Sequence, residues 1–515
     1  MKKSFFVIIC FICFSIYSIF SEGYKIEKVD YDLSGITREN SLKSKFPVDT
    51  STVFQSQEDL ETYLKDLEKR ISNNRIFDWA KVEITSIEQG TEYNIVSILI
   101  ETDDTWNIIA LPYPSYDSNS GFKLKLKVKD YNFMGSMETF DITGNYKFDP
   151  EKKTNDFDIS FDIPFPSFKI LSFDSSFSMD FEVAYTYGDR YPSFDFGQSL
   201  GFGKSINDYF GINFGVSNTF YIAPDYKDYG DDFYFKDNVY LSLPVKLATI
   251  ENVGTLSWSP NVSFTIKWDL EAFKGHENFG MNHSDLLGPS LSFGHSISTG
   301  RVNWDGNFRN GFNASVSQSF DYNFHSKELY QYFNFNSKLY KKFSDVVALA
   351  SAQQFYINVN GNNSEKGGEL RGVRNSYFNS SSALILNFDL PIRLFQTDWV
   401  SFFNWFGLDW KWTRYVDFEF QFSPFLDVAL CKNSSTGTQF LIEDGFYSCG
   451  FEMLVYPKKM KSITGRVSLG IDAVKFLDKV GNKISIVDKV TNRVFNTDWR
   501  YGSMWELFIG IGLFY

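Results

Sequence analysis

The last eleven residues of the sequence, Trp505-Glu-Leu-Phe-Ile-Gly-Ile-Gly-Leu-Phe-Tyr515, carry the pattern that decides the fold. In an extended strand, alternate side chains point to the same face. One face of this segment is apolar along its whole length, which suits the closing strand of a membrane β-barrel with that face toward lipid. The last core strand of a soluble β-sandwich would show the same pattern, so these residues alone leave both folds open. The residues of the apolar face are Trp505, Leu507, Ile509, Ile511, Leu513 and Tyr515.

The N-terminus has the features of a secretory signal peptide. Met1-Lys2-Lys3 is followed by an apolar run from Ser4 to Phe20 and then by Ser21-Glu22-Gly23. A short basic stub, an apolar stretch and a small residue before polar sequence form a cleaved signal, so we predict a signal peptide over residues 1–21. From position 22 onward there is no apolar run of about 18 residues, so we expect no transmembrane helix. An exported chain with a lipid-facing closing strand indicates the outer membrane of a diderm bacterium.

The composition agrees with a barrel and argues against catalysis. The 515 residues include 56 Phe, 29 Tyr and 11 Trp, yet the mean hydropathy is only −0.23. A barrel with aromatic rings on its outside and polar groups in its lumen has both properties. The net charge of −13 argues against nucleic acid as a partner. The four histidines and the two cysteines beyond the signal show no metal-ligand spacing, and no catalytic motif is present, so we expect no enzyme activity, metal or cofactor.

Residues 22–103 are patterned as a small α+β domain. The segment from Ile26 to Leu33 predicts a first strand, and Ser56-Gln-Glu-Asp59 resembles a capping box before apolar residues at helical spacing. Lys81 to Ile87 and Tyr93 to Glu101 predict two strands around a turn, while the chain before the capping box leaves a further helix open. A β-α-α-β-β module directly after a signal peptide resembles a POTRA domain, the periplasmic module of certain outer-membrane barrels.

From residue 104 onward the sequence alternates with a period of two residues. Between Phe122 and Lys129 apolar residues alternate with lysines, and between Asp156 and Ile163 they alternate with Asp and Ser. This pattern suits strands with one face to lipid and the other to a lumen, where we expect the Lys and Asp rows to neutralise each other across neighbouring strands. At about 25 residues per strand and connection, residues 104–515 allow around sixteen antiparallel strands, and about fourteen or eighteen would also fit.

Three short motifs lie in this region. Gly367-Gly-Glu-Leu-Arg-Gly-Val373 is rich in glycine and predicts a loop. A strand follows that ends near Pro391, and Pro424-Phe-Leu-Asp-Val-Ala429 predicts a later one. Tyr131-Asn-Phe-Met-Gly135 contains an Asn-x-x-Gly turn. These motifs lie behind a POTRA-like module and before a C-terminal barrel strand. Together they resemble those of the BamA/TamA/FhaC-type superfamily of POTRA-containing outer-membrane β-barrels, the bacterial surface antigen family.

The resemblance spans the chain from about Tyr24 onward and implies which residues matter. In this superfamily the loop arginine folds back into the lumen and meets a strand aspartate, which implies a pair between Arg371 and Asp427. A guanidinium in a narrow lumen needs a planar acceptor, and a carboxylate accepts two parallel hydrogen bonds. An exposed loop arginine and an unrelated lumen aspartate are the alternative. The loop motif comprises Leu370, Arg371, Gly372 and Val373, the strand motif Phe425, Asp427 and Ala429, and the C-terminal barrel signal Gly510, Leu513 and Tyr515.

The chain departs from the superfamily pattern in several places. Leu370 and Val373 stand where a β-branched residue and an aromatic residue are usual, and Ala429 stands in place of glycine. One POTRA-like module is present, whereas the BamA type has several and the two-partner secretion type has two. These departures affect the identity of the substrate more than the fold.

The segment between Pro391 and Asp417 is longer than a tight turn requires. Tryptophan prefers the headgroup level of a bilayer, because its ring is half apolar while its N–H stays wet. We therefore favour an interfacial segment on the periplasmic side, and girdle aromatics on two adjacent strands are the alternative. The tryptophans of this segment are Trp399, Trp405, Trp410 and Trp412.

Cys431 and Cys449 flank a polar hairpin, Lys432 to Ser448. On a sixteen-strand count this hairpin is extracellular, on an oxidising side where disulfides persist. We predict a disulfide between the two cysteines, with two unpaired thiols as the alternative.

The resemblance implies a factor that inserts or translocates other polypeptides. The POTRA module would receive an extended client, and the barrel would open laterally between its first and last strands. Gly510 and Gly512 in the closing strand favour weak packing there. The expected partners are outer-membrane lipid, unfolded outer-membrane or secreted polypeptide clients, and periplasmic chaperones or lipoproteins. The alternative is an outer-membrane channel or surface adhesin that keeps the family fold without assembly activity.

Overall fold

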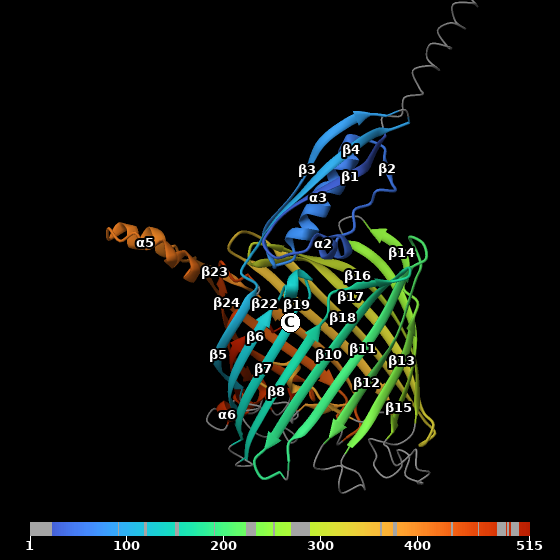
Figure 1. The fold of residues 1–515 in the computed structure, drawn as a ribbon. Helices are drawn as coiled ribbons and strands as arrows, with labels where there is room; N and C mark the ends of the chain where they lie inside the picture. The colour runs from blue at the N-terminus through green and yellow to red at the C-terminus, as the bar shows by residue number, and fades with distance from the viewer. Residues whose placement is uncertain are drawn as a thin grey trace, which may run out of the picture. The chain divides into compact units, whose positions relative to one another are not determined.

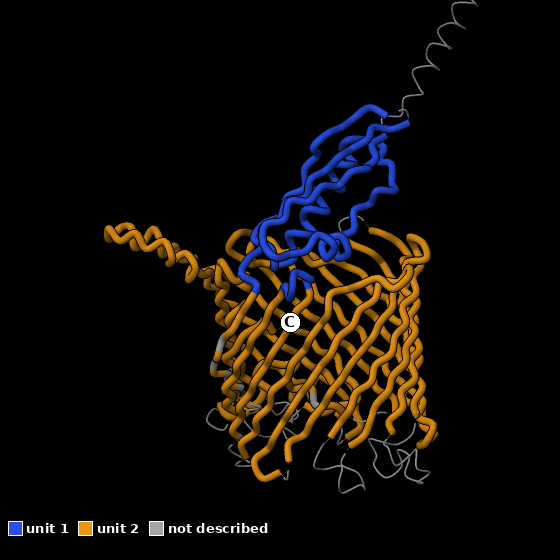
Figure 2. The backbone as a smooth tube through the Cα atoms, viewed as in Figure 1, with its two compact units in different colours: residues 1–107, 132–137 blue, residues 108–131, 138–515 orange. Residues whose placement is uncertain are grey.

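The computed structural model describes most of the chain beyond the signal region, and the predicted signal peptide lies outside the described residues. Among the described residues, no helix has the length and apolarity needed to cross a membrane. The chain divides into two compact units, residues 1–107 with 132–137 and residues 108–131 with 138–515 (Figure 2). The described residues are 23–90, 92–117, 121–149, 154–189, 191–222, 233–250, 253–268, 289–360, 363–373, 378–433, 436–461, 463–481, 491, 494–495 and 504–514.

The first unit is a four-stranded sheet with two helices. The strand order is β2-β1-β4-β3, with β1 parallel to β4 and β3 antiparallel to β4. This arrangement contains the predicted strands and the helix after the capping box, and it adds the helix that the sequence left open. The elements are β1 (Tyr24–Ser34), α2 (Glu39–Lys45), β2 (Val53–Phe54), α3 (Gln57–Ser72), β3 (Phe77–Gln89) and β4 (Asn94–Asp104) (Figure 1).

Helix α3 begins where the sequence predicts it and buries one face. The Ser56 hydroxyl accepts a hydrogen bond from the Asp59 backbone N–H at 3.1 Å and donates to the Asp59 carboxylate at 2.7 Å, which satisfies an otherwise unpaired helical N–H. The buried side chains of α3 recur every three or four residues, as the helical period requires. They are Leu60, Leu64, Leu67 and Ile71, and the buried sheet residues include Ile26, Val96, Ile98 and Ile100.

The Asn-x-x-Gly turn belongs to this first unit, although it lies between two barrel strands in the sequence. The buried Asn132 side-chain amide donates to the Thr37 hydroxyl at 2.7 Å and to Asp104 at 3.3 Å, and its oxygen accepts from the Met137 N–H at 2.9 Å. Gly135 has φ +72°, and a Cβ there would lie 2.0 Å from the Ile36 carbonyl oxygen. Asparagine and glycine are therefore required by hydrogen bonding and by space, respectively.

The second unit is a closed antiparallel barrel (Figure 1). Its described strand segments are β5 (Ile108–Asp117), β6 (Gly121–Asp130), β7 (Phe140–Asp149), β8 (Thr154–Pro164), β9 (Phe168–Ile170), β10 (Phe173–Thr186), β11 (Ser193–Ser205), β12 (Gly211–Ile222), β13 (Phe233–Ser242), β14 (Val245–Ile250), β15 (Gly254–Trp268), β16 (Ser290–Asp305), β17 (Phe308–Asn323), β18 (Glu328–Lys342), β19 (Ala348–Val359), β22 (Ser382–Asp389), β23 (Ile392–Gln396), β24 (Phe418–Cys431), β25 (Phe446–Pro457), β26 (Gly465–Asp472) and β27 (Trp505–Ile511).

Three strands of the wall are interrupted near prolines. β8 and β9 both pair with β10, β13 and β14 both pair with β15, and β22 and β23 both pair with β24. Proline cannot donate to a ladder, and Pro164, Pro244 and Pro391 lie at the interruptions. If each interrupted strand is counted once, the wall has eighteen strands within the described residues. The sequence pattern predicted about sixteen and allowed about eighteen. The arginine loop follows β19, the thirteenth strand of this count.

The two faces of the wall differ as predicted. Along β6, Phe122, Leu124 and Leu126 are exposed on the outer face, while Lys127 and Lys129 lie 3.5 and 3.2 Å from the Asp141 carboxylate of β7. The outer face is the surface that a bilayer covers, so the barrel is a transmembrane one.

The expected neutralisation across neighbouring strands is incomplete. Asp180 of β10 pairs in register with Asp162 of β8, and Glu182 with Asp195 of β11. These four carboxylates carry no ion pair within the described part of the wall. Lys127 and Lys129 of the Lys row thus share one carboxylate, whereas the acidic patch on the next strands has no such pair among the described residues.

Candidate functional site in the barrel lumen

The loop between β19 and β22 carries the predicted arginine and is held by an apolar cluster. A short 3-10 helix, η3 (Gly367–Glu369), leads into Leu370, and Leu370 and Val373 are both buried. The two apolar residues flanking the Arg-Gly pair therefore act as anchors, although Leu370 is not β-branched and Val373 is not aromatic. The cluster comprises Tyr356, Leu370, Val373, Phe378, Ala383, Ile385, Ala429, Cys431 and Phe446.

Arg371 is buried and makes two bidentate contacts with carboxylates. Its Nε and Nη2 donate to Asp427 at 3.0 and 2.6 Å, and its Nη1 and Nη2 donate to Asp389 at 2.7 and 2.9 Å. The backbone N–H of Arg371 also donates to Asp427 at 2.9 Å. The structure thus brings Arg371 and Asp427 together, and it adds Asp389 of β22, whose role the motif did not indicate.

Two aromatic rings lie against the same guanidinium. The Arg371 Cζ is 3.7 Å from the ring centroid of Phe425 and 4.3 Å from that of Phe514. A cation close to an aromatic ring face gains electrostatic stabilisation, and more so when both are desolvated. Phe425 belongs to the predicted strand motif, whereas Phe514 stands next to the end of the sequence and was not singled out.

A second arginine extends the network toward the closing strand. Glu452 of β25 lies 3.3 Å from Arg371 and 3.5 Å from Arg466 of β26. The Arg466 guanidinium lies 4.0 Å from the Phe508 ring centroid. Two arginines and three carboxylates therefore share a confined volume, where each charge depends on the others for compensation.

Gly372 connects the loop to the last two strands. Its backbone has φ +100°, and a Cβ would lie 2.7 Å from the Ile471 nitrogen and 2.8 Å from the Gly470 carbonyl carbon. Its N–H donates to Glu506 of β27 at 2.7 Å. Glycine is required here both by conformation and by the closeness of the β26 backbone.

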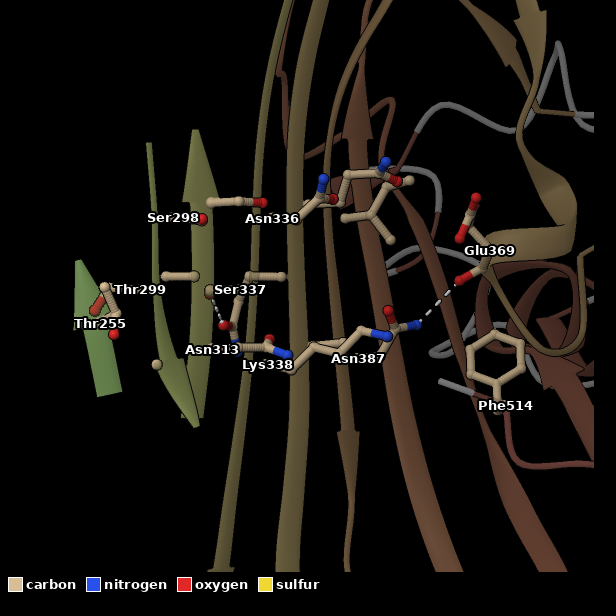
Figure 3. A pocket seen from close by; sticks show the side chains of 17 residues that line it. Thr255, Ser298, Thr299, Asn313, Asn336, Ser337, Lys338, Glu369, Asn387 and Phe514 are labelled. Atoms are coloured by element: carbon tan, nitrogen blue, oxygen red, sulfur yellow. Dashed lines mark hydrogen bonds between the residues drawn. The ribbon is translucent and has the colours of Figure 1, made fainter. Parts of the chain in front are cut away.

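A polar cavity of about 620 Å³ lies beside this loop (Figure 3). The Asn387 side chain reaches across and donates to the Glu369 carbonyl at 3.0 Å. Figure 3 shows Lys338 and Asn336 on one side and Glu369 and Phe514 on the other. The lining hydroxyls, amides and charges suit a hydrated lumen rather than an apolar ligand.

The other predicted site residues border the arginine loop or lie on the closing strand. Ala429 packs in the apolar cluster, where it is fully buried. Gly510 pairs with Arg466 across β26 and β27, and Leu513 follows in the chain. Tyr515 lies outside the described residues.

The predicted disulfide is wrong. Cys431 and Cys449 form no disulfide with each other, and the first is buried while the second is exposed. Cys449 pairs with Leu426 of β24, whereas Cys431 pairs with Ala383 of β22. Five residues of strand, about 17 Å, separate Leu426 from Cys431, and a disulfide needs Cα atoms within about 7 Å. The hairpin between the cysteines is asymmetric, which the sequence spacing does not reveal.

The barrel closes through a short pairing. Among the described residues, which leave out 118–120, β27 and β5 share two residue pairs, Phe508 with Asp117 and Ile509 with Tyr116. β16 and β17, in contrast, pair along sixteen residues. Within the described residues, the seam between the first and last strands therefore has few backbone pairs.

Comparison with known proteins shows similarity at the level of structure. No protein-family model matches the sequence, and no curated protein does so either. CdiB from Acinetobacter baumannii is 9% identical with a TM-score of 0.50, covering 95% of this chain and 74% of that one. CdiB from Escherichia coli is 10% identical with a TM-score of 0.50, covering 95% and 76%. A structure of BamA from Haemophilus ducreyi lacking POTRA domains 1–3 is 11% identical, covers 94% and 84%, and has a TM-score of 0.39.

Proposed function

The chain has the barrel fold of the BamA/TamA/FhaC-type superfamily, and from that premise we propose that it inserts or translocates polypeptides across an outer membrane. The observation that carries this proposal is the short pairing between β27 and β5, for which the described residues show two pairs. A wall that must admit a polypeptide sideways needs one place where few hydrogen bonds have to break. The seam supplies that place, since every other neighbouring pair of full-length strands described pairs over more residues.

The residues at the seam also lower the cost of separating the strands. Gly510 presents no side chain to pack there, and Gly512, just past the end of β27, has φ +105° with no described residue within 4 Å of where a Cβ would lie. Glycine in or beside a strand contributes little cross-strand packing. Opening would therefore disrupt the bond between Gly372 and Glu506 and the two backbone pairs, while the sixteen-residue ladders stay intact.

The lumen network would set the closed state. Arg371 contacts carboxylates from β22, β24 and β25, and Gly372 contacts β27. A single loop thus holds four strands of the wall next to the seam. Release of the loop would free the closing strand without unfolding the rest of the barrel.

The first unit would receive the client as a POTRA-like module on the periplasmic side. In the order β2-β1-β4-β3, strand β3 is an edge strand of thirteen residues. An open edge has unpaired N–H and C=O groups that can add a strand from an extended polypeptide. Trp79 and Ile87 are exposed on this strand and would give such a strand apolar contacts.

The partners follow from this mechanism. An unfolded outer-membrane or secreted polypeptide would be the client, and outer-membrane lipid would surround the barrel. Periplasmic chaperones or lipoproteins would deliver the client. No bond is made or broken, so neither a cofactor nor a catalytic group is needed.

Depletion of the protein in its own cells tests the proposal. Quantification of the outer-membrane and secreted proteins is expected to show loss of many barrel proteins, for an assembly factor, or of one exported protein, for a dedicated translocator. Unchanged levels of all of them, with altered permeability or adhesion only, would overturn the proposal in favour of a channel or adhesin.

A further inference from the structure

The tryptophan-rich segment between β23 and β24 forms a helical hairpin. α5 (Trp399–Trp405) is followed by a turn at Gly407, with φ +77°, and by the 3-10 helix η5 (Lys411–Val416). Figure 1 shows α5 projecting outward from the barrel rim at the end of β23. The segment is therefore not a pair of strands with girdle aromatics, the alternative left open by the sequence.

Hydrogen bonds fix the base of this hairpin on the barrel. The Asp417 carboxylate accepts from the Trp399 N–H at 2.9 Å, and the Thr397 N–H donates to the Phe418 carbonyl at 2.9 Å. Lys458, from the connection after β25, donates from its Nζ to the Thr397 carbonyl at 2.6 Å. Asp398 caps the helix by accepting from the Ser401 N–H at 3.0 Å. These hydrogen bonds fix the orientation of the hairpin relative to the barrel strands that flank it.

The hairpin also has an internal structure. The rings of Phe403 and Trp410 lie 4.8 Å apart and join the two helical turns. The buried Thr413 donates its hydroxyl to the Trp410 carbonyl at 2.7 Å, and the Leu408 N–H donates to the Phe403 carbonyl at 3.0 Å. These contacts bury only part of the aromatic surface of the hairpin.

Most of the remaining aromatic and apolar surface faces outward. Trp405 is 79% exposed and Trp412 is 60% exposed, and no residue of α5 is buried. An exposed apolar patch of this kind marks a contact with a membrane or a protein. The large exposed apolar residues are Phe402, Trp405, Phe406, Leu408, Trp410, Trp412, Tyr415 and Val416.

We propose that the hairpin of residues 398–416 docks into the headgroup region of the bilayer leaflet at this rim. The patch continues the outer surface of the wall, since Leu394 and Phe395 of β23 are exposed just before it. That outer surface already faces lipid. Tryptophan and tyrosine are the residues that prefer the membrane interface, where a ring can be half buried.

The charged residues fit an interfacial position. Asp398 is occupied as the helix cap, and Lys411 lies 3.5 Å from Asp409. The Arg414 guanidinium donates to the Tyr415 hydroxyl at 2.9 Å. Paired charges and a tyrosine hydroxyl remain in water or among headgroups while the rings enter the acyl boundary. The docking does not depend on the proposed handling of clients.

Site-specific fluorescence in phosphatidylcholine vesicles tests this docking. In the full-length protein with C449S, an environment-sensitive label is attached at W405C or, in a second variant, at W412C. Two controls carry the label at L426C, on the exposed outer face of β24, and at H325C, in an exposed turn. Heat-modifiable migration verifies that each variant forms its barrel.

Labels at positions 405 and 412 are expected to be quenched by lipid carrying a nitroxide near the headgroup and only weakly by aqueous iodide. The label at 426 should be quenched best by a nitroxide deeper in the acyl chain, and the label at 325 by iodide. Iodide quenching at 405 and 412 equal to that at 325 would overturn the proposal. Protection from both quenchers would also overturn it, because a second copy or a client polypeptide would then cover the hairpin.

Discussion

The backbone N–H of Gly372 donates to the carboxylate of Glu506 at 2.7 Å, across 134 positions of sequence. This bond joins the arginine loop in the lumen to the closing strand of the barrel. Because Glu506 lies on β27, the loop contacts one of the two strands that form the seam. The loop and the seam can therefore influence each other directly.

Substitution of Glu506 tests this connection. Glu506→Ala leaves the Gly372 N–H without its acceptor, which typically costs about 1–3 kcal/mol, and should lower the temperature at which heat-modifiable migration is lost. Glu506→Gln keeps an acceptor oxygen and should fall close to the unsubstituted protein. Equal behaviour of the alanine variant and the unsubstituted protein would show that the bond does not stabilise the closed seam.

Arg371→Ala should be the most damaging single substitution in the network. It leaves Asp389, Asp427 and Glu452 without the guanidinium that compensates them, and breaking a buried pair in this way costs about 3–5 kcal/mol. Asp427→Ala should cost less, since Arg371 keeps both hydrogen bonds to Asp389.

The two substitutions should be non-additive, because both act on one network. A double-mutant cycle read by heat-modifiable migration measures the coupling. Arg371→Lys, which keeps the charge but cannot make two bidentate contacts, serves as the matched control and should recover part of the loss. Strictly additive effects would contradict a shared network.

Gly372→Ala should be far more harmful than Gly437→Ala. Both glycines have positive φ, +100° and +73°, so both substitutions carry backbone strain. A Cβ at position 372 also meets the β26 backbone at 2.7 Å, whereas no described residue lies within 4 Å of a Cβ at position 437. Comparable stability of the two variants would mean that the loop does not pack against β26 in the folded protein.

The first unit should lose stability in acid through Asp49. Burial raises the pKa of this carboxyl, but hydrogen bonds from Ser51 and Thr52 outweigh it and lower the pKa from 3.8 to about 2. A lowered folded-state pKa stabilises the unit above the unfolded value, and this contribution is lost as pH falls from about 4 to about 2.

Denaturant unfolding of residues 24–102, which we expect to fold alone as a soluble α+β domain, measures this effect. Asp49→Asn should be less stable near neutral pH and should show a smaller change over that acid range. An unchanged pH profile in the asparagine variant would assign the acid sensitivity to other carboxylates.

Much of the fold can be predicted from local sequence patterns. The capping box at Ser56 and the alternation from Phe122 to Lys129 predict α3 and β6, because both depend on the period of the element itself. The number of barrel strands could not be predicted in the same way. Pro164, Pro244 and Pro391 each interrupt a strand that continues along the same neighbour. Sequence alone does not separate an interruption from a turn.

The site was predictable only where a motif carried it. Arg371 and Asp427 are far apart in sequence but belong to two recognisable motifs. Asp389, Glu452 and Glu506 join the same network through barrel register, which no local pattern encodes. The disulfide prediction for Cys431 and Cys449 was wrong for the same reason. The register of β24 and β25 places the two side chains on opposite faces of the wall, and no local pattern encodes that register.

The most direct test of the proposed function is to lock the seam. Tyr116→Cys with Ile509→Cys, a register pair of β5 and β27, would close it on oxidation in a C449S background. Ile297→Cys with Val316→Cys, a register pair of β16 and β17, is the matched control within a long ladder. Client insertion or secretion by cells that depend on each variant is the readout. We predict that oxidation abolishes output from the seam pair alone and that a reductant restores it. Full output from the oxidised seam pair would contradict lateral opening.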